Sequence, residues 1–202
     1  VTFVNEVLNS QKLLDTPTYD EKVLNPFAEI LQKEGKKKLI FLHLMGTHAT
    51  YSKRFPAEFK VFPAQDDSKE ETEKANYDNA VLYNDFVVNS ILDSLTKYAN
   101  INASLASLVY FSDHGENMYN DENKMVGHDW WKIPSTHLLE IPFIVWTSPE
   151  YKTEFPILDS IIYTQTNRAF CNDNFFHSAI DLMHIKSDLF QDSVIPLGKI
   201  KI

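Results

Sequence analysis

The sequence predicts an α/β domain in which a mostly parallel sheet is flanked by helices. Two short apolar runs, residues 38–43 and 106–111, have the length of buried strands, and a long helical pattern connects them. A strand, a crossover helix and a second strand form a βαβ unit, whose strands are parallel. Both runs also end in polar residues, as strands do at the edge of an α/β sheet where ligands bind.

The first half of the chain contains three predicted segments. Residues 20–35 form a helix because Val23, Phe27, Ile30 and Leu31 recur at helical spacing, with Asp20 available to cap the start and Gly35 to end it. Residues 38–43 follow as a buried strand, since this apolar run is too short for a helix. Residues 44–68 form a loop that Pro56 and Pro63 interrupt.

The second half begins with the longest predicted helix, at residues 69–98. Acidic residues crowd its first turns. Its expected buried face comprises Tyr77, Val81, Val88, Ile91, Leu92 and Leu95. A second strand at 108–111, a polar loop at 112–140, a third strand at 141–147 and a last helix at 173–185 complete the prediction.

Composition indicates one folded domain over residues 1–202. The hydrophobic content of 44% and aromatic content of 13% argue against disorder, and a net charge of -9 argues against a nucleic-acid partner. The single cysteine, Cys171, cannot form a disulfide framework or a thiolate metal cluster by itself. No stretch approaches 18 consecutive apolar residues, and the first residues carry no leader pattern.

Histidines and a carboxylate follow both predicted strands. Asp113 and His114 come directly after the second strand, and Gly115 lets the chain turn there. His43 and His48 follow the first strand, and His128 lies in the loop after the second. Because parallel strands end at one sheet edge, we expect these side chains to converge. Imidazole nitrogens and carboxylate oxygens bind zinc, and also manganese, so His48, Asp113, His114 and His128 are the candidate metal ligands.

The remaining polar and aromatic candidates carry weaker signals. Glu116 either orients a ligand histidine or lies on the surface. We interpret His137, His177 and His184 as structural. Trp130 and Trp131 are interpreted as packing residues, with a lip for a lipid or sugar as the alternative.

Several motifs follow one another along the chain. They are His-Leu-Met-Gly-Thr-His at 43–48, Tyr-Ser-Lys-Arg-Phe-Pro at 51–56, the helix at 77–85, Phe-Ser-Asp-His-Gly-Glu at 111–116, Gly-His at 127–128, 141–146 and 173–177. In this order they resemble the motifs of bacterial phosphoethanolamine transferases in the alkaline phosphatase/sulfatase superfamily. The resemblance is collinear over roughly residues 19–185, which is more specific than any one motif.

The resemblance implies a fold, a reaction and a set of roles. The fold would be alkaline phosphatase/sulfatase-like, and one or two zinc ions would be bound. Asp113 and His114 would bind the zinc that activates the nucleophile; His48 and His128 would bind the substrate phosphate or a second zinc; His43 would line the same pocket. Phosphoethanolamine would pass from phosphatidylethanolamine through a phospho-threonine enzyme to a lipid A or surface-glycan acceptor, in the periplasm at the bacterial inner membrane.

Two departures from the family pattern leave other functions open. The family's nucleophilic threonine and one acidic metal ligand have no matching position in this sequence, and the family's N-terminal membrane helices have none either. We therefore expect a partial catalytic domain, incomplete at its N-terminus, that is weak or inactive alone. The alternatives are a sulfatase or phosphodiesterase of the same superfamily and a non-catalytic metal-binding remnant. Cys171 does not stand in the sequence context that a sulfatase nucleophile needs.

Overall fold

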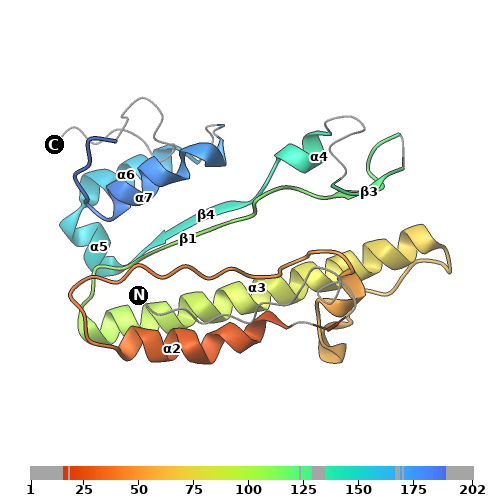
Figure 1. Cartoon of the computed structure of the whole chain (residues 1–202), viewed down its shortest axis with the longest axis horizontal. Helices are drawn as coiled ribbons and strands as arrows, with labels where there is room; N and C mark the ends of the chain where they lie inside the picture. The colour runs from red at the N-terminus through yellow and green to blue at the C-terminus, as the bar shows by residue number, and fades with distance from the viewer. Residues whose placement is uncertain are drawn as a thin grey trace. The chain divides into compact units, whose positions relative to one another are not determined.

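The computed structural model describes residues 16, 17, 19–122, 124–128, 135–166, 169 and 171–189. The chain divides into two compact units, one formed by residues 1–95 and 114–140 and the other by residues 96–113 and 141–202. Figure 1 shows that α3 is the longest element, and it continues from the first unit into the second. Among the described residues, no helix is both long and apolar enough to cross a membrane.

The first unit is mainly helical and contains one short hairpin. Its elements are η1 (Asp20–Val23), α2 (Leu24–Gln32), η2 (Tyr51–Lys53), η3 (Ala57–Phe59), most of α3 (Lys69–Asn102), β2 (Asn117–Met118), β3 (Val126–Gly127) and α4 (Thr136–Leu139). The second unit contains the end of α3, then β1 (Ser107–Phe111), β4 (Phe143–Thr147), α5 (Pro149–Glu154), α6 (Pro156–Thr164), η4 (Asn172–Asn174) and α7 (Phe175–Leu182).

The buried face of α3 differs by about one position from the predicted one. Ala80, Tyr83, Val87 and Ile91 are buried at helical spacing, whereas Val81, which was expected in the core, is 43% exposed. Tyr83 fixes this rotation because Phe59 of η3 packs against its ring at 4.9 Å. The hydrophobic pattern therefore predicted the helix and part of its buried face, since Ile91 is buried as expected and Val81 is not.

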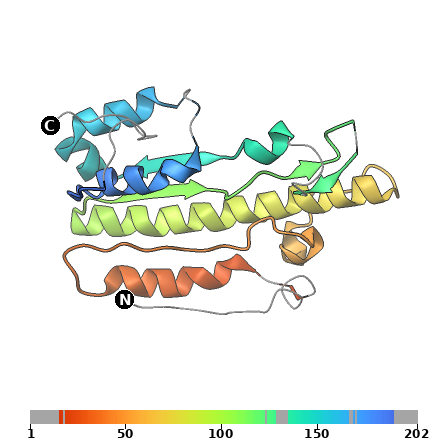
Figure 2. The same ribbon diagram turned by 45° about the horizontal axis from the view of Figure 1, so that its top comes forward.

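The second unit packs three helices against a two-stranded sheet. β1 and β4 are antiparallel, with Val109 opposite Val145 at the centre, and Figure 2 shows the two strands side by side. Tyr151, Leu158 and Leu182 form a buried cluster with side chains of both strands. Ser148 joins β4 to α5: its hydroxyl accepts from the Tyr151 amide at 3.2 Å and donates to the Ser104 carbonyl at 2.9 Å.

The predicted parallel sheet is not found among the described residues, where both strand pairs are antiparallel. The described part of the connection from β1 to β4 holds a hairpin and one helical turn rather than a crossover helix, and β4 returns antiparallel. Residues 38–43 are not a strand, and Leu39 and Phe41 are 59% and 76% exposed. An apolar run becomes a strand only beside a neighbour that supplies hydrogen bonds and packing.

Candidate metal centre

A short hairpin brings Glu116 and His128 together. β2 and β3 pair so that Asn117 lies opposite Gly127, and Glu116 and His128 are the residues that flank this pair along the chain. On the Glu116 side, the Gly115 amide donates to the Leu138 carbonyl at 2.9 Å, which ties the motif at residues 112–116 to α4. Local strand pairing therefore places two residues that are twelve positions apart at the same end of the hairpin.

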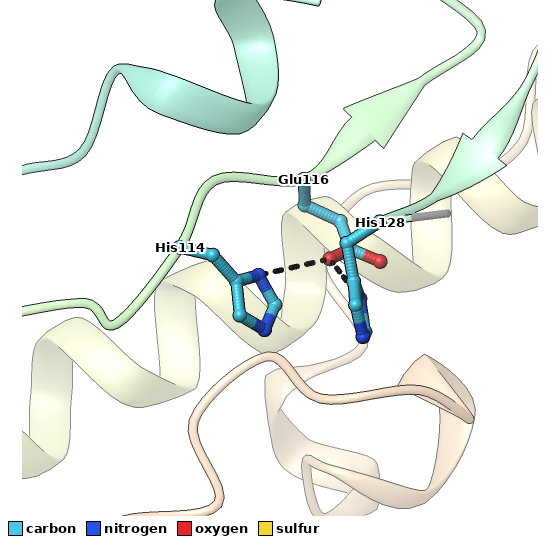
Figure 3. A group of neighbouring side chains, drawn as sticks. All are labelled: His114, Glu116 and His128. Atoms are coloured by element: carbon cyan, nitrogen blue, oxygen red, sulfur yellow. Dashed lines mark hydrogen bonds and ion pairs between the residues drawn. The ribbon is translucent and has the colours of Figure 1, made fainter. Parts of the chain in front are cut away.

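One oxygen of Glu116 faces the imidazole rings of both His114 and His128, as Figure 3 shows. Its Oε2 is 3.1 Å from Nδ1 of His128 and 3.9 Å from Nδ1 of His114, and the ring centroids of the two histidines are 4.1 Å apart. The Glu116 side chain is only 8% exposed. One ligand atom from each of the three residues lies within 4.8 Å of the other two, so the group is compact enough to hold a metal ion.

Backbone carbonyls determine which ring nitrogen can bind a metal. Nδ1 of His114 is 2.8 Å from the Gly115 carbonyl, and Nδ1 of His48 is 2.6 Å from the Ala49 carbonyl. A carbonyl oxygen only accepts, so each Nδ1 carries the proton and each Nε2 carries the lone pair. In Figure 3 the second nitrogens of His114 and His128 point to the same side, away from the carboxylate.

Two buried charged residues hold the loop that carries His48. Asp20 accepts hydrogen bonds from the amides of Met45 and Gly46 at 3.0 and 2.7 Å, rather than capping its own helix as predicted. Burial raises the pKa of Asp20, and these two hydrogen bonds oppose the rise. Arg54, which is 1% exposed, donates from Nε to the His48 carbonyl at 3.0 Å.

The same loop also reaches Glu116. The Tyr51 hydroxyl donates to Glu116 Oε1 at 2.5 Å, and the Tyr51 ring is 3% exposed. Burial raises the pKa of Tyr51, and the neighbouring Glu116 carboxylate raises it further, so the Tyr51 hydroxyl keeps its proton and donates a hydrogen bond at neutral pH. The His48 ring lies edge-on to His128, with ring centroids 6.3 Å apart.

The structure gathers part of the predicted site. It brings His114 and His128 together, with His48 beside His128, whereas the three-residue group found among the described residues does not include Asp113 or His43. His48 meets His128 through its loop and not through the edge of a parallel sheet. Trp130 and Trp131 lie outside the described residues.

Sequence reasoning missed two residues, Tyr51 and Asp20. Tyr51 lies 65 positions before Glu116, and Asp20 lies 25 positions before Met45. A signal was available for Tyr51, which begins the Tyr-Ser-Lys-Arg-Phe-Pro motif, but no pattern in the sequence connects Asp20 to the loop. The structural reading of His184 agrees with its position, because its ring stacks on Phe155 at 3.8 Å.

A comparison of the whole sequence with known protein families gives a match. The Sulfatase family matches residues 3–185, which is most of the chain. This chain belongs to the sulfatase family. A relative within it, the phosphoethanolamine transferase EptC of Escherichia coli K12, is 38% identical over 191 residues, which cover 90% of this chain and 30% of that protein. The phosphoethanolamine transferase EptA of Salmonella typhimurium is 26% identical over 196 residues.

Two solved structures share the sulfatase-like fold of this chain. The C-terminal periplasmic domain of Escherichia coli EptC, in complex with Zn, has a TM-score of 0.81 at 32% identity and covers 94% of this chain and 53% of that one. The integral membrane lipooligosaccharide phosphoethanolamine transferase A of Neisseria meningitidis has a TM-score of 0.74 at 26% identity, covering 88% and 34%. This sulfatase-family chain thus spans about a third of the curated relatives' length.

Proposed function

We propose that this chain is part of the catalytic domain of a metal-dependent phosphoethanolamine transferase. In the proposed reaction, phosphoethanolamine leaves phosphatidylethanolamine and passes to a lipid A or surface-glycan acceptor. The observation that carries the proposal is the group of His114, Glu116 and His128, whose ligand atoms lie within 4.8 Å of one another. The transferase names of its sulfatase-family relatives support the choice of reaction.

The donor set fits zinc, because Nε2 of His114 and Nε2 of His128 face the same side, and two imidazoles with a carboxylate are common zinc ligands. Manganese accepts the same ligands less selectively, and one or two ions are proposed. Bound zinc would act as a Lewis acid on a phosphoryl oxygen. Asp113, which is exposed, is proposed as a further ligand beside His114.

The other residues near the group orient rings and bind the phosphate. Glu116 accepts from Nδ1 of His128 and so holds the His128 ring with its Nε2 facing away from the carboxylate. His48 is exposed beside His128, where its ring can bind a phosphate oxygen, and His43 is proposed to line the same pocket. No residue of this sequence stands in the threonine nucleophile motif, so the chain alone is proposed to be weak or inactive.

The proposed location is the periplasmic side of the bacterial inner membrane. It is supported by the EptC structure, which is a periplasmic domain, and by the Neisseria EptA, which is an integral membrane protein. The donor phospholipid and a lipid A acceptor are both membrane molecules, so a catalytic domain at that surface would meet them. Tethering would come from membrane helices in the whole protein.

Zinc uptake tests the site. The metal-free chain, dialysed against zinc and then against buffer, should retain about one zinc per chain by elemental analysis. His114→Ala and His128→Ala should each abolish retention, because each removes one of the two imidazole ligands, whereas His177→Ala on α7 should retain it. Absence of zinc from the folded wild-type chain would contradict the site.

Lipid A analysis tests the reaction. The full-length protein that carries this sequence, expressed in Escherichia coli, should add phosphoethanolamine to lipid A, detected by mass spectrometry. Its His114→Ala variant should not do so. Hydrolysis of an aryl sulfate or phosphodiester without lipid A modification would instead support the sulfatase or phosphodiesterase alternative, and zinc binding without turnover would support a remnant.

A further inference from the structure

We propose that Tyr51 is a positioning residue for the metal centre: its hydroxyl holds one oxygen of Glu116 so that the other faces the two histidines. This inference rests on the proposed function, because it concerns how the same site is assembled. The observation behind it is that the two oxygens of the Glu116 carboxylate have different partners. Oε1 accepts from Tyr51 at 2.5 Å, while Oε2 lies 3.1 Å from Nδ1 of His128.

Tyr51 can position Glu116 because Tyr51 itself is immobilised. Its ring is 3% exposed and packs edge-on against Tyr77 of α3, with ring centroids 5.3 Å apart and an interplanar angle of 82°. Its backbone lies in the short η2 turn, where the Tyr51 carbonyl accepts from the Arg54 amide at 2.9 Å. The hydroxyl is therefore presented from a fixed ring at the end of a fixed turn.

Glu116 needs such a partner because its side chain has several rotatable bonds. A carboxylate that rotates presents either oxygen, or neither, to the histidines, and ordering it costs rotamer entropy. With Oε1 occupied by Tyr51, Oε2 is the oxygen that accepts from Nδ1 of His128 and fixes that ring. The Tyr51 hydroxyl thereby acts on His128 through Glu116.

The η2 turn also connects this arrangement to His48. Arg54 directly follows η2 and donates from Nε to the His48 carbonyl at 3.0 Å. Two buried side chains three positions apart, Tyr51 and Arg54, thus fix two different parts of the candidate centre. The rings of His48 and His128, which Arg54 and Tyr51 hold in this way, have centroids 6.3 Å apart.

Tyr51→Phe tests the proposal, because it keeps the ring and its packing on Tyr77 and removes only the hydroxyl. We expect zinc affinity, measured by competition with a chromophoric chelator, to fall about 10- to 100-fold, as for other partners of metal ligands. Tyr151→Phe is the matched control. Tyr151 is also 3% exposed and its hydroxyl also makes a hydrogen bond, to the Leu182 carbonyl at 2.9 Å, so this variant should leave zinc affinity unchanged.

A double-mutant cycle separates positioning from a general loss of structure. Glu116→Gln should weaken zinc binding in the wild-type chain, and its further effect in the Tyr51→Phe background should be much smaller, because the two groups act as one unit. Equal zinc affinity of Tyr51→Phe and wild type, or additive effects in the cycle, would overturn the inference alone. A wild-type chain that binds no zinc would overturn the proposed function and this inference together.

Discussion

Gly115 is the position where a single methyl group should do most damage to the site. A Cβ at Gly115 would lie 2.0 Å from the His137 carbonyl oxygen and 3.0 Å from the carbonyl carbons of His137 and Leu138. Because these are backbone atoms, no side-chain rotation relieves the contact. Gly115→Ala should therefore separate the motif at residues 112–116 from α4 and lose the hydrogen bond from the Gly115 amide to Leu138.

The expected loss can be assembled from two contributions. Overpacking costs about 1–3 kcal/mol and the lost hydrogen bond about 0.5–1.5 kcal/mol, so Gly115→Ala should lower the free energy of unfolding by about 2–4 kcal/mol. That is a large share of the about 5–15 kcal/mol that stabilises a typical domain. With a urea m-value of about 2 kcal/mol/M, the midpoint should fall by about 1–2 M.

Urea unfolding followed by circular dichroism measures this loss. Gly46→Ala is the companion variant, because a Cβ there meets nothing closer than 3.7 Å and only its positive φ of 53° is unfavourable. It should lose about 1–2 kcal/mol. A Gly115→Ala chain within about 0.5 kcal/mol of the wild type would refute the argument from the collision.

Two further predictions concern the first unit. Asn79→Ala should lower the free energy of unfolding, measured in urea, by about 2–4 kcal/mol. The buried Asn79 side chain accepts from the amides of Val61 and Phe62 at 2.7 and 2.8 Å and donates to the Phe62 carbonyl at 2.9 Å. A loss below about 1 kcal/mol would contradict this prediction. Burial raises the pKa of Tyr83 from 10.0 to about 12, so the folded state keeps a proton that the unfolded state releases, and stability should fall as pH rises through that interval. Between about pH 8 and pH 11, the free energy of unfolding should fall less in Tyr83→Phe than in the wild type. An equal fall in the two proteins would contradict the raised pKa of Tyr83.

Local patterns predicted the elements whose signal lies within one segment. The helix expected at residues 69–98 is α3, the strand at 108–111 is β1, and the helix at 173–185 contains η4 and α7. In each case the spacing of apolar residues or the length of an apolar run is itself the cause of the structure. The helices α5 and α6 were not predicted, although Ser148 and Pro149 supply a cap and a first-turn proline.

Pairing between distant segments could not be predicted in the same way. Residues 38–43 have the composition of a strand, but a run of apolar residues does not specify which neighbour pairs with it or in which direction. The hairpin of β2 and β3 was missed because each strand has only two residues, too few for an alternating pattern. The direction of β4 depends on how the preceding loop folds, which its polar composition does not reveal.

The sequence pointed to individual residues of the candidate site but not to the contacts between them. His114 and His128 belong to short motifs, and the structure places their rings together. Glu116 was considered as a residue that orients a ligand histidine, and its contact with His128 fits that role. The hydroxyl of Tyr51 reaches Glu116 across 65 positions, a relation that only the folded chain shows.

The attachment of the His48 loop to Asp20 affects where in the sequence inactivating substitutions should be found. Asp20 is remote in sequence from every histidine of the centre, yet its carboxylate fixes the Met45 and Gly46 amides within the loop that ends at His48. A screen for inactive variants confined to the histidine motifs would overlook it. In a saturation library of the whole gene, we expect position 20 to tolerate as few substitutions as the motif residues, although it touches no ligand.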